Sequence, residues 1–404
     1  MNYKSIFNLL GILLGIFSLS FIPPLVLTFV YRESGMEIFL YSFIFFSILG
    51  SSLWAVTRQQ NLPLNISDGF IITTLFWVVL ACAGSIPFYF FGLSISDSVF
   101  ESVSGITTTG ATTIIGLDNL PKSILFYRQL LQWIGGMGLI ILAVAVMPAL
   151  GIGGGQLYKM ELPGSHGNQK LTPKITDSAK ALWKIYVGLT LICAILYLSS
   201  GMDLFDSIAH SLSTVAGGGF STHDQSIGFF NSSLIETVCI VFMLLSAASF
   251  AVHYVAIFGG KPLKYFYDSE FRFFLSVIML IILISFMVHL INNSFTDIFS
   301  TFGSTIFQVV SIVTTSGFTT ENFSLWPGFL PYLLLVGAFM GACSQSVGGG
   351  IKAWRVLIMI NQAYKEILKT IHPNAVLSSK IGTKVVDAKI AEKVWGFFSI
   401  YVFI

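Results

Sequence analysis

Charged residues are scarce in this chain of 404 residues: Asp, Glu, Lys and Arg together make up only 10%. A soluble globular domain carries about 25% charged residues. Hydrophobic residues account for 54% of the chain, and its mean hydropathy is +0.82. The shortage of charge excludes a water-soluble globular protein and predicts a chain that lies in the lipid bilayer.

Cysteine is also scarce, and no two cysteines stand at the spacing of a metal-ligand or redox pair. The four cysteines all lie in apolar runs: Cys82, Cys193, Cys239 and Cys343. We therefore expect buried thiols, and neither a disulfide framework nor a zinc site. The glycine runs at 151–155 and 347–352 lack the spacing of a phosphate-binding loop. No nucleotide and no other cofactor is expected in this chain.

Long apolar runs are abundant. An α-helix needs about 20 apolar residues to cross a bilayer. The candidate spans are 5–30, 38–57, 69–92, 124–149, 182–202, 233–258, 271–292 and 326–360, with a further one that starts near Lys393. The first run is too long for a signal peptide and has no small-residue cleavage site, so we expect a first transmembrane helix.

Shorter semi-polar segments lie between some of these spans, at 96–116, 203–222 and 297–320. Each starts with an acid that we expect at a helix N-cap: Asp97, Asp206 and Asp297. Each ends in small and hydroxyl residues, TTTGATT, AGGGFST and TTSGFTT. Irregular backbone at membrane depth is tolerated only where it lines a water-filled path or is buried in protein. The pattern therefore predicts half-helices followed by loops that leave the membrane on the side they entered.

The basic residues give the expected orientation. Sixteen of the 21 Lys and Arg residues fall in 151–184, 258–272 and 352–393. The stretches 200–257 and 292–351 contain none. The positive-inside rule puts the lysine-rich loops in the cytoplasm. The semi-polar segments then enter from outside, although Lys122 and Arg128 flank the first one.

The three segments align on one glycine each, Gly110, Gly219 and Gly317. Around each glycine the order is outer helix, half-helix, loop and inner helix. We expect an all-α integral membrane protein with an N-terminal helix pair and pseudo-four-fold repeats of helix, pore loop and helix. Since the fourth repeat only begins before Ile404, we expect it to be truncated and the chain to be incomplete at its C-terminus.

The expected domains follow from these repeats. They are an N-terminal transmembrane helix pair at 1–65, pore repeat 1 at 66–155, a cytoplasmic linker with pore repeat 2 at 156–260, pore repeat 3 with a broken inner helix at 261–362, and a cytoplasmic segment with the start of repeat 4 at 363–404.

Such loops suit a cation filter, in which backbone carbonyls and hydroxyls replace the water shell of the ion. Glycine tolerates the positive φ angles that this needs. An acid follows each glycine, Asp118, Asp224 or Glu321. These acids either concentrate cations at the external mouth or are ordinary solvated loop charges. Without a nucleotide site, the driving force is the ion gradient and the membrane potential, which is worth about 2.3 kcal/mol per charge at 100 mV.

The last complete span must break. A helix over 326–360 would be about 52 Å long, against a hydrocarbon core of about 30 Å. We expect a movable intramembrane loop at 341–350 that gates the pore, with a static kink as the alternative. The expected gate residues are Gly341, Ser344, Gln345, Ser346, Gly348, Gly349, Gly350 and Lys352. Lys352 is either a lysine that reaches to the membrane surface or a tethered cation near the gate.

Other functions fit less well. A carrier coupled to protons or sodium should place acids at mid-membrane as relays. The nearest acids, Glu101 and Glu236, are expected near the ends of a half-helix or span. A membrane enzyme should show a nucleophile with a base, or a metal-ligand cluster, and neither is present in the sequence. The coupled carrier remains the alternative, and a truncated product that does not conduct is a further possibility.

Five motifs carry a resemblance to a known family: SGITTTGATTI (104–114), FYRQLLQWIGGMG (126–138), HSLSTVAGGGFSTHD (210–224), TTSGFTTENFSLWP (314–327) and GGGIK (348–352). The chain resembles the Trk/Ktr/HKT superfamily of potassium transporters and, within it, the bacterial TrkH type of membrane subunit. The resemblance runs along the whole chain, and the extra N-terminal helix pair favours the TrkH type over the shorter Ktr type.

The resemblance implies potassium uptake across the bacterial inner membrane by a multi-pass subunit that is usually a homodimer. It also implies a cytoplasmic nucleotide-binding ring protein of the TrkA type as the regulator, lipid around the spans, and no nucleic acid. Carried over by position, the potassium-binding residues are Thr108, Thr109, Gly110, Gly217, Gly218, Gly219, Thr315, Ser316 and Gly317. Gly217 stands where a larger residue is typical, and Ser316 where threonine is common.

Overall fold

The computed structural model describes residues 3–58, 66–146, 175–292, 297–373, 380–381, 384–385 and 388–403. Most of the expected cytoplasmic linker, 156–181, lies outside the described residues. The chain forms two compact units. The first comprises Met1–Ser246 and Ser316–Glu321, and the second comprises Ala247–Thr315 and Asn322–Ile404.

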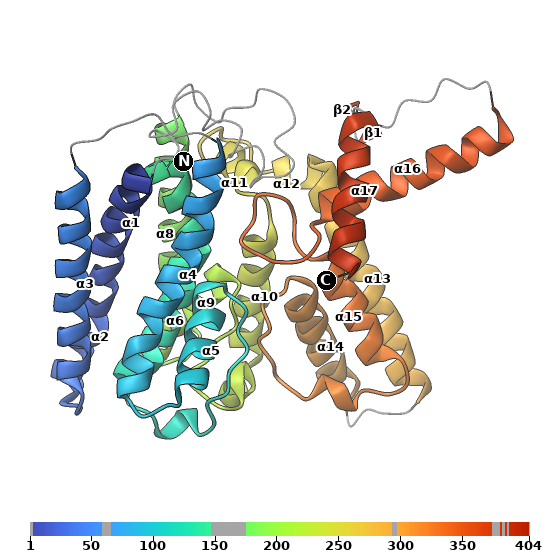
Figure 1. The fold of residues 1–404 in the computed structure, drawn as a ribbon. Helices are drawn as coiled ribbons and strands as arrows, with labels where there is room; N and C mark the ends of the chain where they lie inside the picture. Colours follow the sequence, from blue (N-terminus) through green and yellow to red (C-terminus); the bar gives the residue numbers. More distant parts are fainter. Residues whose placement is uncertain are drawn as a thin grey trace. The chain divides into compact units, whose positions relative to one another are not determined.

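The first unit is helical. Its helices are α1 (Tyr3–Ser18), α2 (Ile22–Tyr31), α3 (Met36–Thr57), α4 (Ile66–Phe90), α5 (Ile95–Ile106), α6 (Lys122–Val146), α8 (Ile175–Ser199), α9 (Leu204–Ala216) and α10 (Ser233–Ala247). Figure 1 shows α5 and α9 as short helices that lie beside the longer α4 and α6. The short helices are the half-helices expected at 96–116 and 203–222.

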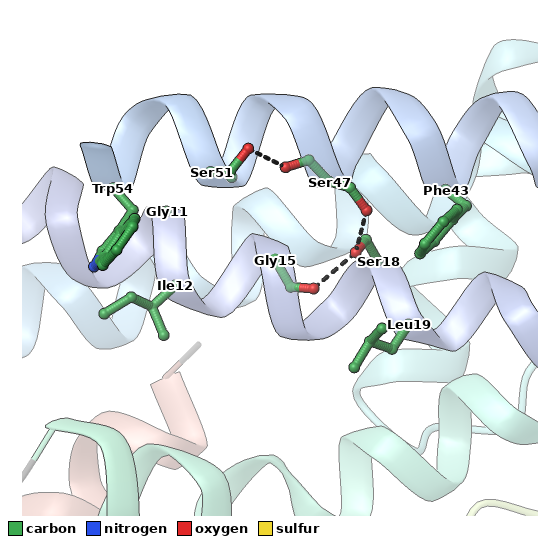
Figure 2. Close-up of a pocket in the computed structure, with 10 residues that line it drawn as sticks. Gly11, Ile12, Gly15, Ser18, Leu19, Phe43, Ser47, Ser51 and Trp54 are labelled. Atoms are coloured by element: carbon green, nitrogen blue, oxygen red, sulfur yellow. Dashed lines mark hydrogen bonds between the residues drawn. The ribbon is translucent and has the colours of Figure 1, made fainter. Parts of the chain in front are cut away.

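The N-terminal pair packs closely because both helices carry glycine at the crossing. A Cβ on Gly50 would lie 2.8 Å from the Gly11 carbonyl oxygen, so the two backbones are nearly in contact. Small residues permit such close approach between membrane helices. Ser18 of α1 and Ser47 of α3 hydrogen-bond at 2.9 Å in a shallow groove beside this crossing (Figure 2).

The second unit is also helical apart from one short hairpin. Its helices are α11 (Phe250–Ile257), α12 (Lys264–Tyr267), α13 (Ser269–Ile291), α14 (Ile298–Val313), α15 (Leu330–Met340), α16 (Ala353–Ile371) and α17 (Ala388–Phe403). The strands β1 (Lys380–Ile381) and β2 (Lys384–Val385) pair antiparallel. In this unit α16 projects sideways from the upright α13, α15 and α17 (Figure 1).

Five helices in the described part of the chain are long and apolar enough to cross a membrane: Tyr3–Tyr31, Met36–Thr57, Asp68–Phe90, Lys180–Ser199 and Ser269–Ile291. They match five of the expected spans. The helices Ser233–Ala247 and Phe250–Ile257 make a sixth if they form one broken span. The all-α membrane fold is therefore confirmed.

Three local expectations need correction. The N-caps of α5 and α9 are Ser94 and Asp203, which accept hydrogen bonds from the backbone N–H of Asp97 and Asp206. The two acids therefore lie in the first helical turn, where the helix dipole stabilises a negative charge. Asp297 is the N-cap of α14 as expected. Cys82 is exposed, whereas the other three cysteines are buried.

Candidate functional site: three glycine loops and an intramembrane loop

Three loops follow the half-helices, and their backbones repeat one conformational pattern. The aligned glycines Gly110, Gly219 and Gly317 have φ angles of 79°, 76° and 85°. The residue two positions before each glycine is also left-handed: Thr108 (φ 55°), Gly217 (φ 65°) and Thr315 (φ 62°). Since β-branched residues rarely adopt positive φ, two threonines hold this conformation at a steric cost that Gly217 avoids.

The loops meet inside the first unit. A Cβ on Gly110 would collide with the carbonyl oxygen of Gly218, and a Cβ on Gly219 would collide with the carbonyl oxygen of Ser316. The first loop therefore lies against the second, and the second against the third. The structure brings together the glycine positions that the sequence aligned, with carbonyl oxygens at both meeting points. Such an arrangement presents oxygen ligands to a dehydrated cation.

The long last span is broken where glycines and polar residues accumulate. Helix α15 ends at Met340, and α16 begins at Ala353. The ends of the intervening loop, 341–352, come back together, because Ala342 N–H donates to Gly349 O at 3.2 Å and Lys352 N–H donates to Met340 O at 3.0 Å. The backbones of Gly341 and Gly350 approach so closely that neither has room for a Cβ. The expected break is confirmed.

The intramembrane loop contacts the two residues that directly follow the third half-helix, α14, within the second unit. The backbone N–H of Gly349 donates to Thr315 Oγ1 at 2.6 Å. A Cβ on Gly348 would lie 2.8 Å from the Thr314 carbonyl oxygen. Lys352 donates to the carbonyl oxygens of Ser346 and Gly348. Its ammonium therefore binds the loop itself and does not extend freely to the membrane surface.

The remaining polar residues of the loop are largely buried. Ser344 and Ser346 are 2% and 8% exposed, and Ser346 Oγ donates to Cys343 O at 2.6 Å. Gln345 has a φ of 60°, and its carbonyl oxygen accepts from Phe250 N–H at 2.9 Å. The Ser346 hydroxyl is therefore satisfied within the loop and the Gln345 carbonyl by α11, whereas the buried hydroxyl of Ser344 has no hydrogen-bond partner among the described residues.

Glu270 of α13 is a site residue that the sequence did not reveal. Its Oε1 accepts hydrogen bonds from Ser344 N–H at 2.5 Å and from Trp354 N–H at 3.1 Å. One buried carboxylate oxygen thus connects the intramembrane loop, at Ser344, with the first turn of α16, at Trp354. In the sequence Glu270 is an ordinary acid beside a basic loop, and its partners lie 74 and 84 residues away.

The acids expected at the external mouth hold loops to one another. Asp224 Oδ1 accepts from the backbone N–H of Gly116 and of Leu117, each at 3.1 Å. Asp118 contacts His223 Nδ1 at 2.5 Å. Glu321 is exposed. Asp118 and Asp224 therefore connect the first and second loops, in addition to any attraction they exert on cations.

His223 lies between two carboxylates. Its Nδ1 faces Asp118, its Nε2 faces Asp206 at 3.1 Å, and its ring stacks on Phe229 at 3.5 Å. His210 is the other titratable group beside it, with ring centroids 6.4 Å apart. Burial alone would lower the pKa of His223, but the hydrogen bonds to Asp206 and Asp118 outweigh it and raise that pKa. The hydrogen bond from His223 lowers the pKa of Asp118.

This cluster predicts a stability that depends on pH. The ion pairs contribute fully between the ordinary pKa values, 3.8 for Asp118 and 6.5 for His223. Their contribution is lost as the pH rises through the raised pKa of His223 or falls through the lowered pKa of Asp118. The thermal midpoint of the solubilised protein should therefore fall as the pH rises above 6.5, and His223→Gln should flatten that decline. An equal decline in His223→Gln would contradict this assignment.

Glu101 and Arg128 form a buried ion pair. Glu101 lies within α5 and not near its end, which corrects the expectation from the sequence. Both side chains are 0% exposed, and Arg128 Nε lies 3.2 Å from Glu101 Oε2. Charges at this depth persist when they are paired and hydrogen-bonded. Glu101 is therefore already bound to a cation of the protein itself and does not have the setting of a free proton relay.

Comparisons with known proteins identify the family. Residues 35–404 match the family model described as "TrkH: Cation transport protein". The Trk system potassium uptake protein TrkH of Vibrio parahaemolyticus is 46% identical over 99% of this chain and 84% of the relative. TrkH of Escherichia coli K12 is 45% identical with the same coverage, and TrkG of that strain is 40% identical over 99% of this chain and 83% of the relative.

A solved structure has the same fold. The crystal structure of the potassium transporter TrkH from Vibrio parahaemolyticus superposes with a TM-score of 0.90 at 44% sequence identity, covering all of this chain and 84% of the other. The superposition supports the all-α membrane fold over the whole length of this chain. The chain therefore belongs to the TrkH family of cation transport proteins.

Proposed function

We propose that this protein carries potassium ions into the cell, across the bacterial inner membrane, through a gated, channel-like selectivity filter. It is a multi-pass membrane protein and not an enzyme. The observation that carries the proposal is that the loops around Gly110, Gly219 and Gly317 meet within the first unit, where each of these glycines has a positive φ. The names of its relatives, Trk system potassium uptake proteins, identify potassium as the ion.

The filter consists of the residues that the sequence aligned, from Thr108 to Gly110, from Gly217 to Gly219 and from Thr315 to Gly317. Backbone oxygens there replace the hydration shell of the ion. The helix C-terminal ends of α5, α9 and α14 precede these loops and carry partial negative charge, which attracts a cation. The middle residues of the three ranges are Thr109, Gly218 and Ser316. The acids Asp118, Asp224 and Glu321 surround the external entrance of the filter.

The intramembrane loop is the gate. Gly349 of this loop contacts Thr315, which follows the third half-helix, and the loop is held by Lys352 and Glu270. Loops in the interior of a protein move when a few discrete contacts break. The gate residues are therefore those of the broken span: Gly341, Ser344, Gln345, Ser346, Gly348, Gly349, Gly350 and Lys352.

The membrane potential supplies the driving force. One charge that crosses 100 mV gains about 2.3 kcal/mol, and each factor of ten in concentration costs about 1.4 kcal/mol. Potassium therefore accumulates roughly fifty-fold without an internal motor. A member of a Trk system works with other components of that system. We assign it a TrkA-like cytoplasmic ring protein as regulator and a second copy of itself as a dimer partner.

A reversal-potential measurement tests this function. The full-length protein is reconstituted in planar bilayers, and the reversal potential of its current is recorded while potassium, sodium and pH are varied separately. We expect a shift of about 59 mV for each tenfold change in the potassium gradient, and no shift with sodium or pH. A dependence on either would instead support the coupled carrier, and bilayers without protein serve as the control.

A further inference from the structure

Three polar side chains on α6 face the backbone of the second filter loop. Arg128, Gln129 and Gln132 stand within one turn of this inner helix and share a face, since residues three and four apart are neighbours on a helix. All three are 0% exposed. Buried polar side chains in a membrane helix are costly unless they have specific partners. Their partners therefore indicate what they do.

Gln132 contacts the loop most closely. Its Nε2 donates to Gly218 O at 2.7 Å, and its Oε1 accepts from Phe220 N–H at 3.1 Å. Its Oε1 also accepts from Ser213 Oγ, on the half-helix α9, at 2.5 Å. A Cβ on Gly218 would collide with the amide of Gln132. The Gln132 amide therefore fits against the filter backbone with no space between them.

Arg128 and Gln129 extend the same contact along the loop. Arg128 Nη1 donates to Ser221 O at 3.2 Å, and Gln129 Nε2 donates to Phe220 O at 3.4 Å. The Arg128 guanidinium also lies 4.2 Å from the centre of the Phe220 ring. Three carbonyl groups of the second loop, those of Gly218, Phe220 and Ser221, thus receive donors from one helix face, which we call the α6 ladder (Arg128, Gln129 and Gln132).

The same arginine connects the second loop to the first. Its Nη2 donates to Thr112 Oγ1 at 3.0 Å, and its Nε pairs with Glu101. Glu101 Oε1 in turn accepts from Thr113 N–H at 2.8 Å and from the Thr112 hydroxyl. The residues that follow Gly110 and those that follow Gly219 are therefore held by one buried ion pair.

We propose that the α6 ladder positions the second filter loop and thereby sets the preference of the pore for potassium over sodium. The inference rests on the proposed function. Ion preference depends on where the coordinating carbonyl dipoles are held, and supporting hydrogen bonds are what fix such positions. Gln132 fixes the carbonyl of Gly218 directly, and Arg128 fixes the two loops relative to each other. These are positioning residues and do not themselves contact the ion.

The test compares the potassium-to-sodium permeability ratio of three variants of the full-length protein in planar bilayers. Gln132→Met keeps the volume of the side chain and removes its three hydrogen bonds. Arg128→Lys keeps the positive charge and removes the planar guanidinium group with its fixed donors. The matched control is Trp133→Phe, which also removes one hydrogen bond of α6, the partly buried bond from Trp133 Nε1 to Thr190 Oγ1 at 3.0 Å. Thr190 belongs to α8 and not to a filter loop.

We expect the permeability ratio to fall at least about tenfold in Gln132→Met, because the loss of even one well-placed buried hydrogen bond has an effect of about that size and this variant loses three. We expect a smaller fall in Arg128→Lys. Trp133→Phe should keep the wild-type ratio. An unchanged ratio in both ladder variants would overturn the proposal. So would loss of both variants from the membrane while Trp133→Phe persists, since the ladder would then serve folding alone. A wild-type protein without potassium selectivity would instead refute the proposed function itself.

Discussion

Gly219→Ala should abolish potassium uptake, whereas Gly92→Ala should leave it close to the wild-type level. Both glycines have positive φ, 76° and 112°. Each substitution therefore incurs the left-handed cost of about 1–2 kcal/mol. Only at Gly219 does the new Cβ also collide with a backbone carbonyl oxygen, that of Ser316. A Cβ added at Gly92 would meet no atom of a neighbouring segment within 4 Å. The collision would separate the second and third loops, which the filter requires to meet.

The measurement is rubidium or potassium uptake by a bacterial strain that lacks its own potassium uptake systems. The amount of each variant in the membrane fraction is measured in parallel, so that uptake is compared per molecule. Equal uptake by the Gly219→Ala and Gly92→Ala variants would show that the contact between Gly219 and Ser316 is not needed for transport.

Removing the Glu270 carboxylate should increase the open probability of the pore by about tenfold to a hundredfold. Glu270→Ala leaves the backbone N–H groups of Ser344 and Trp354 without their acceptor. An unsatisfied buried donor costs about 1–3 kcal/mol, and about 1.4 kcal/mol changes an equilibrium tenfold. The unsatisfied N–H groups destabilise the state in which the intramembrane loop is packed. States in which water reaches these groups therefore become more populated.

Single-channel recording in planar bilayers gives the open probability directly. Glu366→Ala is the matched control, because that carboxylate is exposed and contacts Gln362 and Lys369 on the surface of α16. The control should behave like the wild type. An open probability that falls or stays the same in Glu270→Ala would mean that the carboxylate does not hold a closed loop.

The half-helices and their loops could be predicted from the sequence because their signals are local. A short apolar stretch that ends in glycine, serine and threonine predicts a half-helix and its loop without any knowledge of the segments packed against it. The break at 341–352 is equally local, since glycine destabilises a helix wherever it stands. The N-caps were misplaced by three residues at α5 and α9, because an acid in the first turn resembles the cap that precedes it.

The side chains that hold the filter loops in place could not be predicted, because their contacts join residues that are far apart in the sequence. Arg128 is in the motif FYRQLLQWIGGMG but its partner Ser221 lies 93 residues away, and Gln132 lies 86 residues from Gly218. In the sequence, Arg128 resembles a flanking charge and Glu101 a half-helix acid. Only the folded backbone shows that the two neutralise each other between two loops.

Thr315 keeps a left-handed conformation, φ 62°, that a glycine would adopt at less cost. Strain of this kind persists only where surrounding contacts maintain it, and the hydroxyl of Thr315 accepts the N–H of Gly349. If the intramembrane loop withdraws, the hydroxyl loses that partner and the residue can relax. If the intramembrane loop is the gate and Thr315 belongs to the filter, as we propose, ion discrimination would change as the pore opens, because the same residue contacts the loop and shapes the ion's coordination shell.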